Sequence, residues 1–558
     1  MKIRQIIALA LLVFLVAILL TLVPRATAVR SNDYRWFDPI VDIRSHIVND
    51  YVESPDEAAM QRAVIDAMLE ALDDPFTNWV SPEDQSDFSK ELSGNYVGIG
   101  ARIKPGEEWL TIITPMEDSP ALAAGVRAGD IVLTIDGEST QNRPVDECID
   151  ALLGVPGTTV DVRVRHTDDV EEDLVITRAP IRARTTFGLI RRDRDWQYLI
   201  DEDRGVAYVR LESFTERTDD ELQAVLGELA GAGALNGVII DVRDNPGGAL
   251  SAALETADLF VDEGTLLSIR SARPERRTGG REFTAKAQGT LPDMPVIVLI
   301  NDASASASEI VAGSLKDNDR ALVVGERSFG KGSVQEVREL EDDNGLLKFT
   351  TAYYYLPSGR SLHKKPGDVE VDWGVDPSEG CIVPEQISDV RARIQAREPW
   401  TIITDDEPVD PATHDPEWIR STMEDNMLAR ALELMAHRVD AGAWPEPDPE
   451  IDPAGDIALR NDLDRAMKER DAIEGALTRV QTRIDELNGL VDLQQHGIEL
   501  PEDAELEDAT LVIRDSDGAI VGEWSISSLI DLQRSLGSVA LTPVDSTSEP
   551  EDSTSEED

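Results

Sequence analysis

Four short apolar runs between residues 206 and 326 constrain the fold of this chain more than any other feature. They are VAYVRL, GVIIDVR, PVIVLIN and ALVVGE, and each has the length of a single strand. Helical runs lie between them, namely DDELQAVLGELAG, GALSAALETADLF and SEIVAGSLKDN. Apolar strands that alternate with helices are typical of a buried sheet with helices packed on it. The sequence therefore predicts an α/β core.

The region before this core has two other patterns. Residues 54–75, SPDEAAMQRAVIDAMLEALDDP, carry apolar side chains at helical spacing, with Ser54 or Asp56 as the N-cap and Pro75 at the end. From Gly94 the chain changes to short strands and glycines: NYVGIGARI, WLTIITPM, DIVLTIDG and TTVDVRVRH. A short helix closed by glycines, SPALAAGVRAGD, separates two of these runs. We expect a helical region followed by a β-rich domain.

Beyond residue 385 the chain turns rich in proline and acidic residues, and then contains one long helical pattern. Residues 459–491 place apolar side chains four and three apart, which fits a coiled coil, a helical hairpin or an ordinary amphipathic helix packed on its own domain. TLVIRDSDGAIVGEWSI predicts a β-hairpin around Asp517-Gly518. The acidic, low-complexity ending DSTSEPEDSTSEED indicates disorder.

The N-terminus indicates export. Lys2 and Arg4 precede an 18-residue apolar run, Ile6 to Val23, and the small residues Ala26-Thr27-Ala28 follow it. This length fits either a signal peptide or one spanning helix, and the positive flank stays in the cytoplasm in both cases. We therefore expect the rest of the chain in the bacterial cell envelope or periplasm, secreted or anchored by one helix.

The charge balance excludes one class of partner. The 558 residues include 109 acidic and 53 basic side chains, for a net charge of −56, and such a chain repels nucleic acid. The two cysteines, Cys148 and Cys381, have no metal-binding or redox spacing, and whether they pair stays open. The pattern of Cys, His and acidic residues predicts neither a metal site nor a cofactor.

Three alternating serines, Ser304, Ser306 and Ser308, stand at the start of a helical run. Ser306 with Glu309 fits a capping box, which would make the serine structural. The alternative is a nucleophile, which needs a base. Lys331 follows 25 residues later in GERSFGKGSVQ, just past the apolar run ALVVGE, and a partly buried lysine loses its proton more readily. A neutral amine there can take the serine proton, and Gln335 can orient it.

Seven motifs in order resemble the carboxyl-terminal processing peptidases, also called tail-specific proteases. The motifs are DPFTNWVSPED, YVGIGARI, SPALAAGVRAGDIVLTIDG, DVRDNPGGAL, SASASEIVAGSLKDN, SFGKGSVQ and LPSGRSL, and they cover about residues 35 to 380. The resemblance implies Ser306 as nucleophile, Lys331 as general base and Gln335 as the orienting partner of Lys331. It implies that Ser304 and Ser308 are spacers and caps. The oxyanion would be held by the amide of Ala307 at a helix start and by that of Gly247 or Gly248.

The stretch from Gly94 to Arg178 resembles a PDZ domain. Its GIGA loop, Gly98, Ile99, Gly100 and Ala101, would present amides to a terminal carboxylate, and the next strand would pair with the tail of the substrate. One residue departs from the family pattern, because Leu153 stands where members often carry Arg or Lys. This puts in doubt a charged contact between the PDZ domain and the active site.

The expected fold is multidomain α/β, and the expected segments are these: 1–28 signal peptide or anchor; 29–93 helical; 94–180 PDZ; 181–384 Ser–Lys peptidase core; 385–541 C-terminal extension; 542–558 disordered acidic tail. The expected function is an exported serine endopeptidase acting on protein or peptide substrates that are unfolded or have exposed C-termini. An inactive PDZ scaffold and a different Ser–Lys hydrolase are the alternatives. The 459–491 helix suggests self-association.

Overall fold

The computed structural model describes residues 35–85, 88, 95–106, 108–192, 194–271, 280–287, 291, 294–364, 373–404 and 411–447, with scattered positions between 463 and 484 and the stretches 509–514 and 520–526. The segment 1–28 and the tail 542–558 lie outside the described residues. Contacts divide the chain into two compact units, Met1–Glu385 with Arg391–Asp448 and Gln386–Val390 with Pro449–Asp558. In the described stretches no helix has the length and apolar character needed to cross a bilayer.

The predicted α/β core is confirmed, and its centre is a mainly parallel sheet. The parallel strands lie in the order β14 (Val206–Leu211), β15 (Gly237–Asp241), β18 (Val296–Ile300) and β19 (Ala321–Gly325). Two short strands, β10 (Thr186–Phe187) and β13 (Leu199–Asp201), pair antiparallel with β14. Every residue of β14, β15 and β18 is buried, because helices cover both faces of the sheet.

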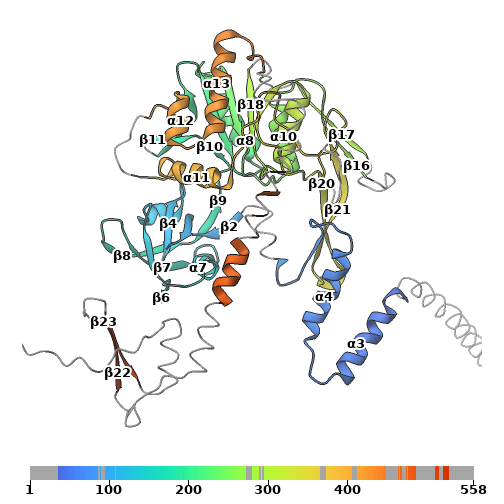
Figure 1. The fold of residues 1–558 in the computed structure, drawn as a ribbon, viewed down its shortest axis with the longest axis vertical. Helices are drawn as coiled ribbons and strands as arrows, with labels where there is room; N and C mark the ends of the chain where they lie inside the picture. Colours follow the sequence, from blue (N-terminus) through green and yellow to red (C-terminus); the bar gives the residue numbers. More distant parts are fainter. Residues whose placement is uncertain are drawn as a thin grey trace, which may run out of the picture. The chain divides into compact units, whose positions relative to one another are not determined.

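Helices from distant parts of the sequence cover the two faces. On one face Val209 packs in a cluster with α8 (Thr218–Gly231), α9 (Leu250–Asp258) and α10 (Ala307–Asp317). On the other, Tyr208 packs with α12 (Pro416–Thr422) and α13 (Asn426–Ala441). Figure 1 shows the sheet with α13 on one side and α10 on the other. The core that we expected to end at residue 384 therefore continues through α13.

A buried ion network connects α13 to the end of β15. The Arg243 guanidinium lies 2.7 Å from the carboxylate of Asp241 and 2.8 Å from that of Asp425, the N-cap of α13. Arg393, on α11 (Ile387–Thr401), donates to Glu385 at 2.9 Å and to Asp244 at 3.1 Å. A buried charge is costly unless it is paired. If α11 or α13 left the core, a charged side chain would remain buried without its partner.

Residues 95–182 form the β-rich domain that the sequence predicts. Its sheet has the order β3 (Ala101–Pro105), β4 (Leu110–Pro115), β5 (Ile131–Ile135), β7 (Thr159–Arg165) and β8 (Glu171–Thr177), with β6 (Glu138–Ser139) on β5. The helices α6 (Pro120–Ala124) and α7 (Val145–Leu152) pack on it around one apolar cluster. The chain enters through β2 (Asn95–Gly98) and leaves through β9 (Ala179–Arg182), which pair with each other.

A third sheet carries the loop with Lys331. Its strands are β1 (Asn78–Val80), β21 (Leu346–Tyr355), β16 (Thr265–Arg270), β17 (Arg281–Thr284) and β20 (Ser333–Glu339), which pairs with β21. Before β1 come η1 (Arg35–Phe37), α3 (Asp38–Asp50) and α4 (Glu57–Glu70), none of which buries a residue. Of the two N-caps predicted for the helix at 54–75, Asp56 is the one used, since its carboxylate accepts the Ala59 N–H at 3.0 Å.

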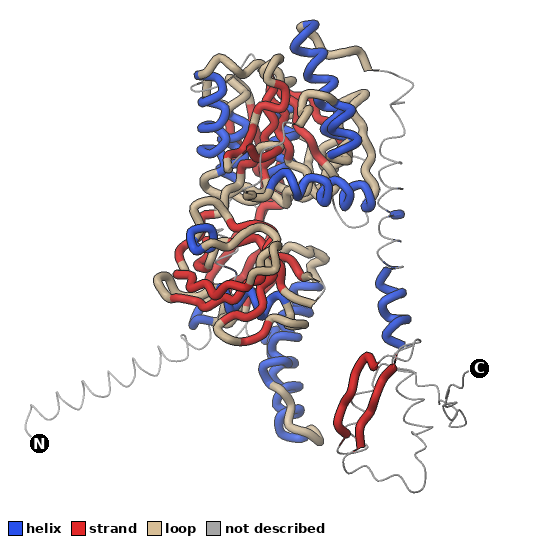
Figure 2. Tube along the Cα trace, turned by 90° about the vertical axis from the view of Figure 1, so that its left-hand side faces the viewer, coloured by secondary structure: helices blue, strands red, loops and turns tan. Residues whose placement is uncertain are grey.

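The remaining elements are short or belong to the second unit. In the first unit, β11 (Ile190–Arg192) pairs with β12 (Asp195–Gln197), and η2 (Glu341–Asp343) precedes β21. In the second, residues 475–484 are helical, and their apolar side chains Leu477, Val480 and Ile484 are exposed. The predicted hairpin is present as β22 (Ala509–Arg514) paired with β23 (Ile520–Ile526), the two strands at the lower right of Figure 2. Its expected turn, Asp517-Gly518, lies outside the described residues.

Candidate active site

The first residue of the candidate site is Ser306, at the junction between a buried loop and α10. Its backbone has φ 55° and ψ −109°, which a residue other than glycine adopts at a cost of about 1–3 kcal/mol. The flanking serines are buried and bonded: Ser304 Oγ donates to Val242 O at 2.8 Å, and Ser308 Oγ donates to Asn245 O at 2.9 Å. Ser306 is only half-buried. Within SASAS, the hydroxyls of Ser304 and Ser308 are therefore held by hydrogen bonds, and Ser306 is the serine that remains accessible.

Glu309 ties the start of α10 to the loop that carries Lys331. Its side chain is fully buried, and its Oε2 accepts the backbone N–H of Ser306 and that of Lys331, each at 2.8 Å. Its Oε1 accepts Ser328 Oγ–H at 2.6 Å and the Gly330 N–H at 2.7 Å. Burial raises the pKa of Glu309, and these four hydrogen bonds oppose the rise. From the sequence, Glu309 was expected only to cap a helix. In the structure its carboxylate also binds the backbone of the loop that carries Lys331.

Lys331 lies half-buried between β19 and β20, with its amine 4.9 Å from the centre of the Phe76 ring. Burial lowers the pKa of Lys331, and the charge of Lys348 on β21 lowers it further, while Glu309 opposes the shift. A lysine with a lowered pKa can act as a base, because more of it is neutral at a given pH.

Gln335 lies two residues into β20, and its side-chain amide donates within the sheet. Its Nε2 donates to Ser333 Oγ at 2.8 Å and to Thr350 Oγ1 at 3.3 Å. These bonds fix Gln335 between β20 and β21, beside the loop of Lys331, and they occupy both of its amide protons.

The NPGG turn lies against Ser306. A Cβ on Gly247 would be 2.8 Å from Ser306 Cβ and 2.9 Å from Ala307 N, so only glycine allows this approach. The Gly247 N–H already donates to Asn245 Oδ1 at 2.8 Å. Gly248 has φ 144°, and a Cβ there would clash with Phe214 O. Of the two glycines proposed as oxyanion donors, Gly247 therefore has its amide committed to another acceptor.

The GIGA loop of the β-rich domain follows β2. The carbonyl of Ile99 accepts the Ala121 N–H at 2.8 Å, and that of Gly100 accepts the Met116 N–H at 2.9 Å. These bonds fix the loop against α6, and β3, which begins at Ala101, forms one edge of the domain's sheet. Leu153 lies beside the loop, because its Cδ2 would be 3.2 Å from a Cβ on Gly98.

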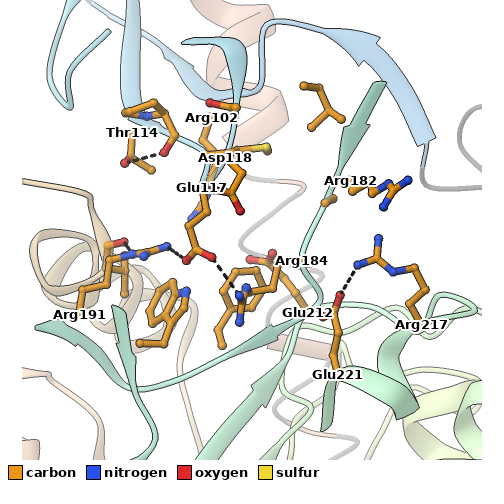
Figure 3. A pocket seen from close by; sticks show the side chains of 18 of the residues that line it. Arg102, Thr114, Glu117, Asp118, Arg182, Arg184, Arg191, Glu212, Arg217 and Glu221 are labelled. Atoms are coloured by element: carbon orange, nitrogen blue, oxygen red, sulfur yellow. Dashed lines mark hydrogen bonds and ion pairs between the residues drawn. The ribbon is translucent and has the colours of Figure 1, made fainter. Parts of the chain in front are cut away.

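Ion pairs join the β-rich domain to the core at a cavity of about 720 Å³. Glu117, after β4, lies 3.0 Å from Arg184 and 2.7 Å from Arg191, and Figure 3 shows its carboxylate between the two guanidinium groups. Lys104 on β3 lies 2.6 Å from Glu398 on α11. These contacts could not be predicted from the sequence, because each joins residues that have no local pattern in common.

Both cysteines, Cys148 in α7 and Cys381 between β21 and α11, are buried, and no disulfide joins them. Among the described residues no group of three His, Cys, Asp or Glu side chains is placed to hold a metal ion.

Comparison with known proteins gives two family matches. Residues 205–377 match the family Peptidase family S41, and residues 111–166 match the family PDZ domain. A carboxy-terminal-processing protease of Bartonella bacilliformis is 34% identical over 365 residues, which cover 64% of this chain and 80% of that protein. The carboxy-terminal processing protease CtpA of Bacillus subtilis is 30% identical over 329 residues, covering 59% and 67%.

Among solved structures, a photosystem II D1 C-terminal processing protease matches 69% of this chain and 92% of its own, at 27% identity and a TM-score of 0.36. The identity to the Bartonella protease extends over four fifths of that protein. This chain, with its PDZ domain and its α/β peptidase core, therefore belongs to the carboxy-terminal processing serine proteases.

Proposed function

We propose that the chain is an exported endopeptidase in which Ser306 is the nucleophile and Lys331 the general base. The observation that carries the proposal is the shared anchor: one buried carboxylate, Glu309, binds the backbone N–H of both residues at 2.8 Å. A nucleophile and its base must keep one relative geometry for proton transfer, and a common rigid acceptor supplies it.

In the proposed reaction the neutral amine of Lys331 takes the proton of Ser306 Oγ as the oxygen attacks a peptide carbonyl. The backbone amide of Ala307, at the N-terminus of α10, donates to the resulting oxyanion. We assign the second donor to Gly248 rather than Gly247, because the Gly247 N–H is bonded to Asn245. The Lys331 ammonium then protonates the leaving amine, and water hydrolyses the acyl-enzyme by the same route in reverse.

Gln335 has a second role in this scheme, beside the orienting role that its motif suggests. Because its side-chain amide donates to Ser333 and Thr350, we propose that Gln335 makes the start of β20 rigid and thereby fixes the position of Lys331, which lies just before this strand. It acts on the base through the backbone.

The PDZ domain would select the substrate. We propose that the amides of Gly98, Ile99, Gly100 and Ala101 bind the terminal carboxylate of an unfolded or C-terminally exposed chain, and that the substrate tail pairs with β3. The edge position of β3 in its sheet supports strand addition there.

The location and assembly of the protein are further proposals. The apolar run Ile6 to Val23 supports export to the cell envelope, with the chain either released or held by that segment. The exposed apolar side chains Leu477, Val480 and Ile484 support self-association through the 459–491 helix, since a helix with such a stripe gains stability by burying it.

The decisive experiment follows cleavage of an unfolded protein by the chain without residues 1–28, beside Ser306→Ala and Lys331→Met. Methionine keeps the length and apolar character of the lysine stem but removes the amine. We expect cleavage by the wild type and a loss of several orders of magnitude in each variant, because the two residues act as a unit. Cleavage that survives Lys331→Met would show that another group is the base, and an inert wild type would favour a PDZ scaffold.

A further inference from the structure

The turn Asp74–Trp79, sequence DPFTNW, connects α4 to β1 and has no role in the proposed reaction. Its shape is fixed by Asp74, whose Oδ1 accepts the Phe76 N–H at 3.0 Å and whose Oδ2 accepts Thr77 Oγ1–H at 2.7 Å. Pro75 between them restricts the backbone further. The turn is therefore rigid, and the direction of the Phe76 side chain is set by it.

The turn is also attached to the sheet that carries the base. The Thr350 N–H of β21 donates to Thr77 Oγ1 at 3.2 Å, and β1 pairs with β21 from Asn78 onwards. Trp79 Nε1 donates to Asn344 O at 2.9 Å. Thr350 is the residue whose hydroxyl accepts the Gln335 amide, so the turn and Gln335 meet at one point of β21.

This arrangement places the ring of Phe76 over the amine of Lys331, at 4.9 Å from the ring centre. A ring in that position has two opposed effects on the amine. It excludes water, which favours the neutral amine, and its face attracts the ammonium, which favours the charged form. The charged groups that act on the amine are Lys348 on β21 and Glu309 on α10.

We propose that Phe76 is a positioning residue for Lys331, and that the N-terminal DPFTNW turn completes the general base by covering its amine. The inference rests on the proposed function, in which Lys331 is the base. It assigns a catalytic purpose to a segment that lies outside the residues matched by the peptidase family, 205–377. Burial lowers the pKa of Lys331, and the ring at 4.9 Å is one of the groups that cover the amine.

The test compares Phe76→Ala with Phe76→Leu. Alanine uncovers the amine, whereas leucine keeps an apolar cover and removes only the aromatic face. We expect Phe76→Ala to move the acidic limb of the kcat/KM profile to higher pH, with a loss of about tenfold or more near neutral pH that recovers in alkali. We expect Phe76→Leu to keep the limb at its wild-type pH or move it lower. The control is Phe349→Ala, a half-buried phenylalanine on β21 whose ring lies over Arg338 instead.

A second measurement does not depend on cleavage. In the Ser306→Ala background, competitive acylation of Lys331 followed by mass spectrometry reports how much of its amine is neutral at each pH. We expect Phe76→Ala to slow this labelling severalfold near neutral pH, and Phe76→Leu and Phe349→Ala to leave it unchanged or faster. If Phe76→Ala labels as the wild type does, the inference is wrong even where cleavage is lost. If Lys331 is labelled as predicted but the wild-type chain cleaves no substrate, the proposed function is wrong. The inference that Phe76 covers the amine of Lys331 is then still supported.

Discussion

Replacing Asp425 should destabilise the whole peptidase core, although this residue lies beyond the segment that the sequence assigned to it. The Asp425 side chain is 6% exposed and accepts two hydrogen bonds from Arg243, each 2.8 Å long. Its Oδ1 also caps α13 by accepting the Leu428 N–H at 2.8 Å. Two separate contributions are therefore lost together in Asp425→Ala, and one of them is kept in Asp425→Asn.

The magnitude follows from what each variant leaves behind. Breaking a buried pair by removing one partner costs about 3–5 kcal/mol. Arg243 keeps Asp241 at 2.7 Å, so we place the loss in Asp425→Asn at the lower end, about 3 kcal/mol. Asparagine still caps a helix, whereas alanine forfeits about 1 kcal/mol more. The control is Asp440→Asn, whose partner Arg204 lies 3.0 Å away on the surface and whose loss should cost less than about 1 kcal/mol.

Urea unfolding of the chain without residues 1–28, followed by tryptophan fluorescence, measures these differences as shifts of the core transition. We expect the order of midpoints to be wild type, Asp440→Asn, Asp425→Asn and Asp425→Ala, from highest to lowest. Burial alone would raise the pKa of Asp425, but Arg243 holds it below the ordinary value. The pair therefore stabilises the fold above the unfolded pKa of an aspartate and is lost as the pH falls through the folded pKa. Equal midpoints for the two asparagine variants would refute the assignment of α13 to the core.

Two further predictions concern Glu309 and the PDZ domain. Glu309→Gln keeps the size of the side chain but removes acceptors for the N–H groups that it binds, so we expect kcat to fall on the order of 100-fold with little change in KM. Because the charge of Glu309 raises the pKa of Lys331, the acidic limb should also move to lower pH, and a limb that moves upward would contradict this reasoning. In the PDZ domain, His166 lies buried between Asp130, at 2.8 Å, and Glu172, at 3.1 Å. Burial lowers the pKa of His166, but the two carboxylates raise it by more, so the charged histidine stabilises the domain. That stabilisation is complete below the unfolded pKa of histidine and disappears as the pH rises through the folded pKa. We expect the thermal midpoint of the PDZ transition to decrease as the pH is raised from mildly acidic to alkaline. In His166→Asn the same decrease should be smaller, as measured by calorimetry.

The α/β core could be predicted because burial on both faces leaves a plain signal in a strand. VAYVRL and PVIVLIN are apolar throughout, since β14 and β18 have helices on each side. The helices of one face could be found by alternation with the strands. Those of the other could not, because α13 begins about 100 residues after β19, the last strand of the sheet, and nothing in its sequence indicates which element it packs against. The contact that identifies it, Arg243 with Asp425, joins two residues 182 positions apart.

The candidate site divides in the same way between local and distant information. Ser306, Lys331 and the NPGG turn stand in motifs, and the sequence alone singles them out. The sequence explained Glu309 as a cap, because its bond to the Ser306 N–H is local. Its bonds to Ser328, Gly330 and Lys331 form only when the loop after β19 folds back over α10, and no spacing rule foresees that. Gln335 also stands in a motif, but the bonds that its Nε2 donates to Ser333 and Thr350 lie within the sheet, and no motif indicates them.

These contacts imply that residues 205–377, the part matched by the peptidase family, are not a folding unit by themselves. Without α12 and α13 the face of the sheet that carries Tyr208, Ile239 and Ile297 would meet water, although each of these side chains is at most 1% exposed in the whole chain. Arg243 would keep Asp241 but lose Asp425 and Glu385. Without the N-terminal turn, the amine of Lys331 would lose the ring that covers it. The chemistry of the site can therefore be stated from the matched segment, whereas its stability and the environment of its base depend on residues before and after it.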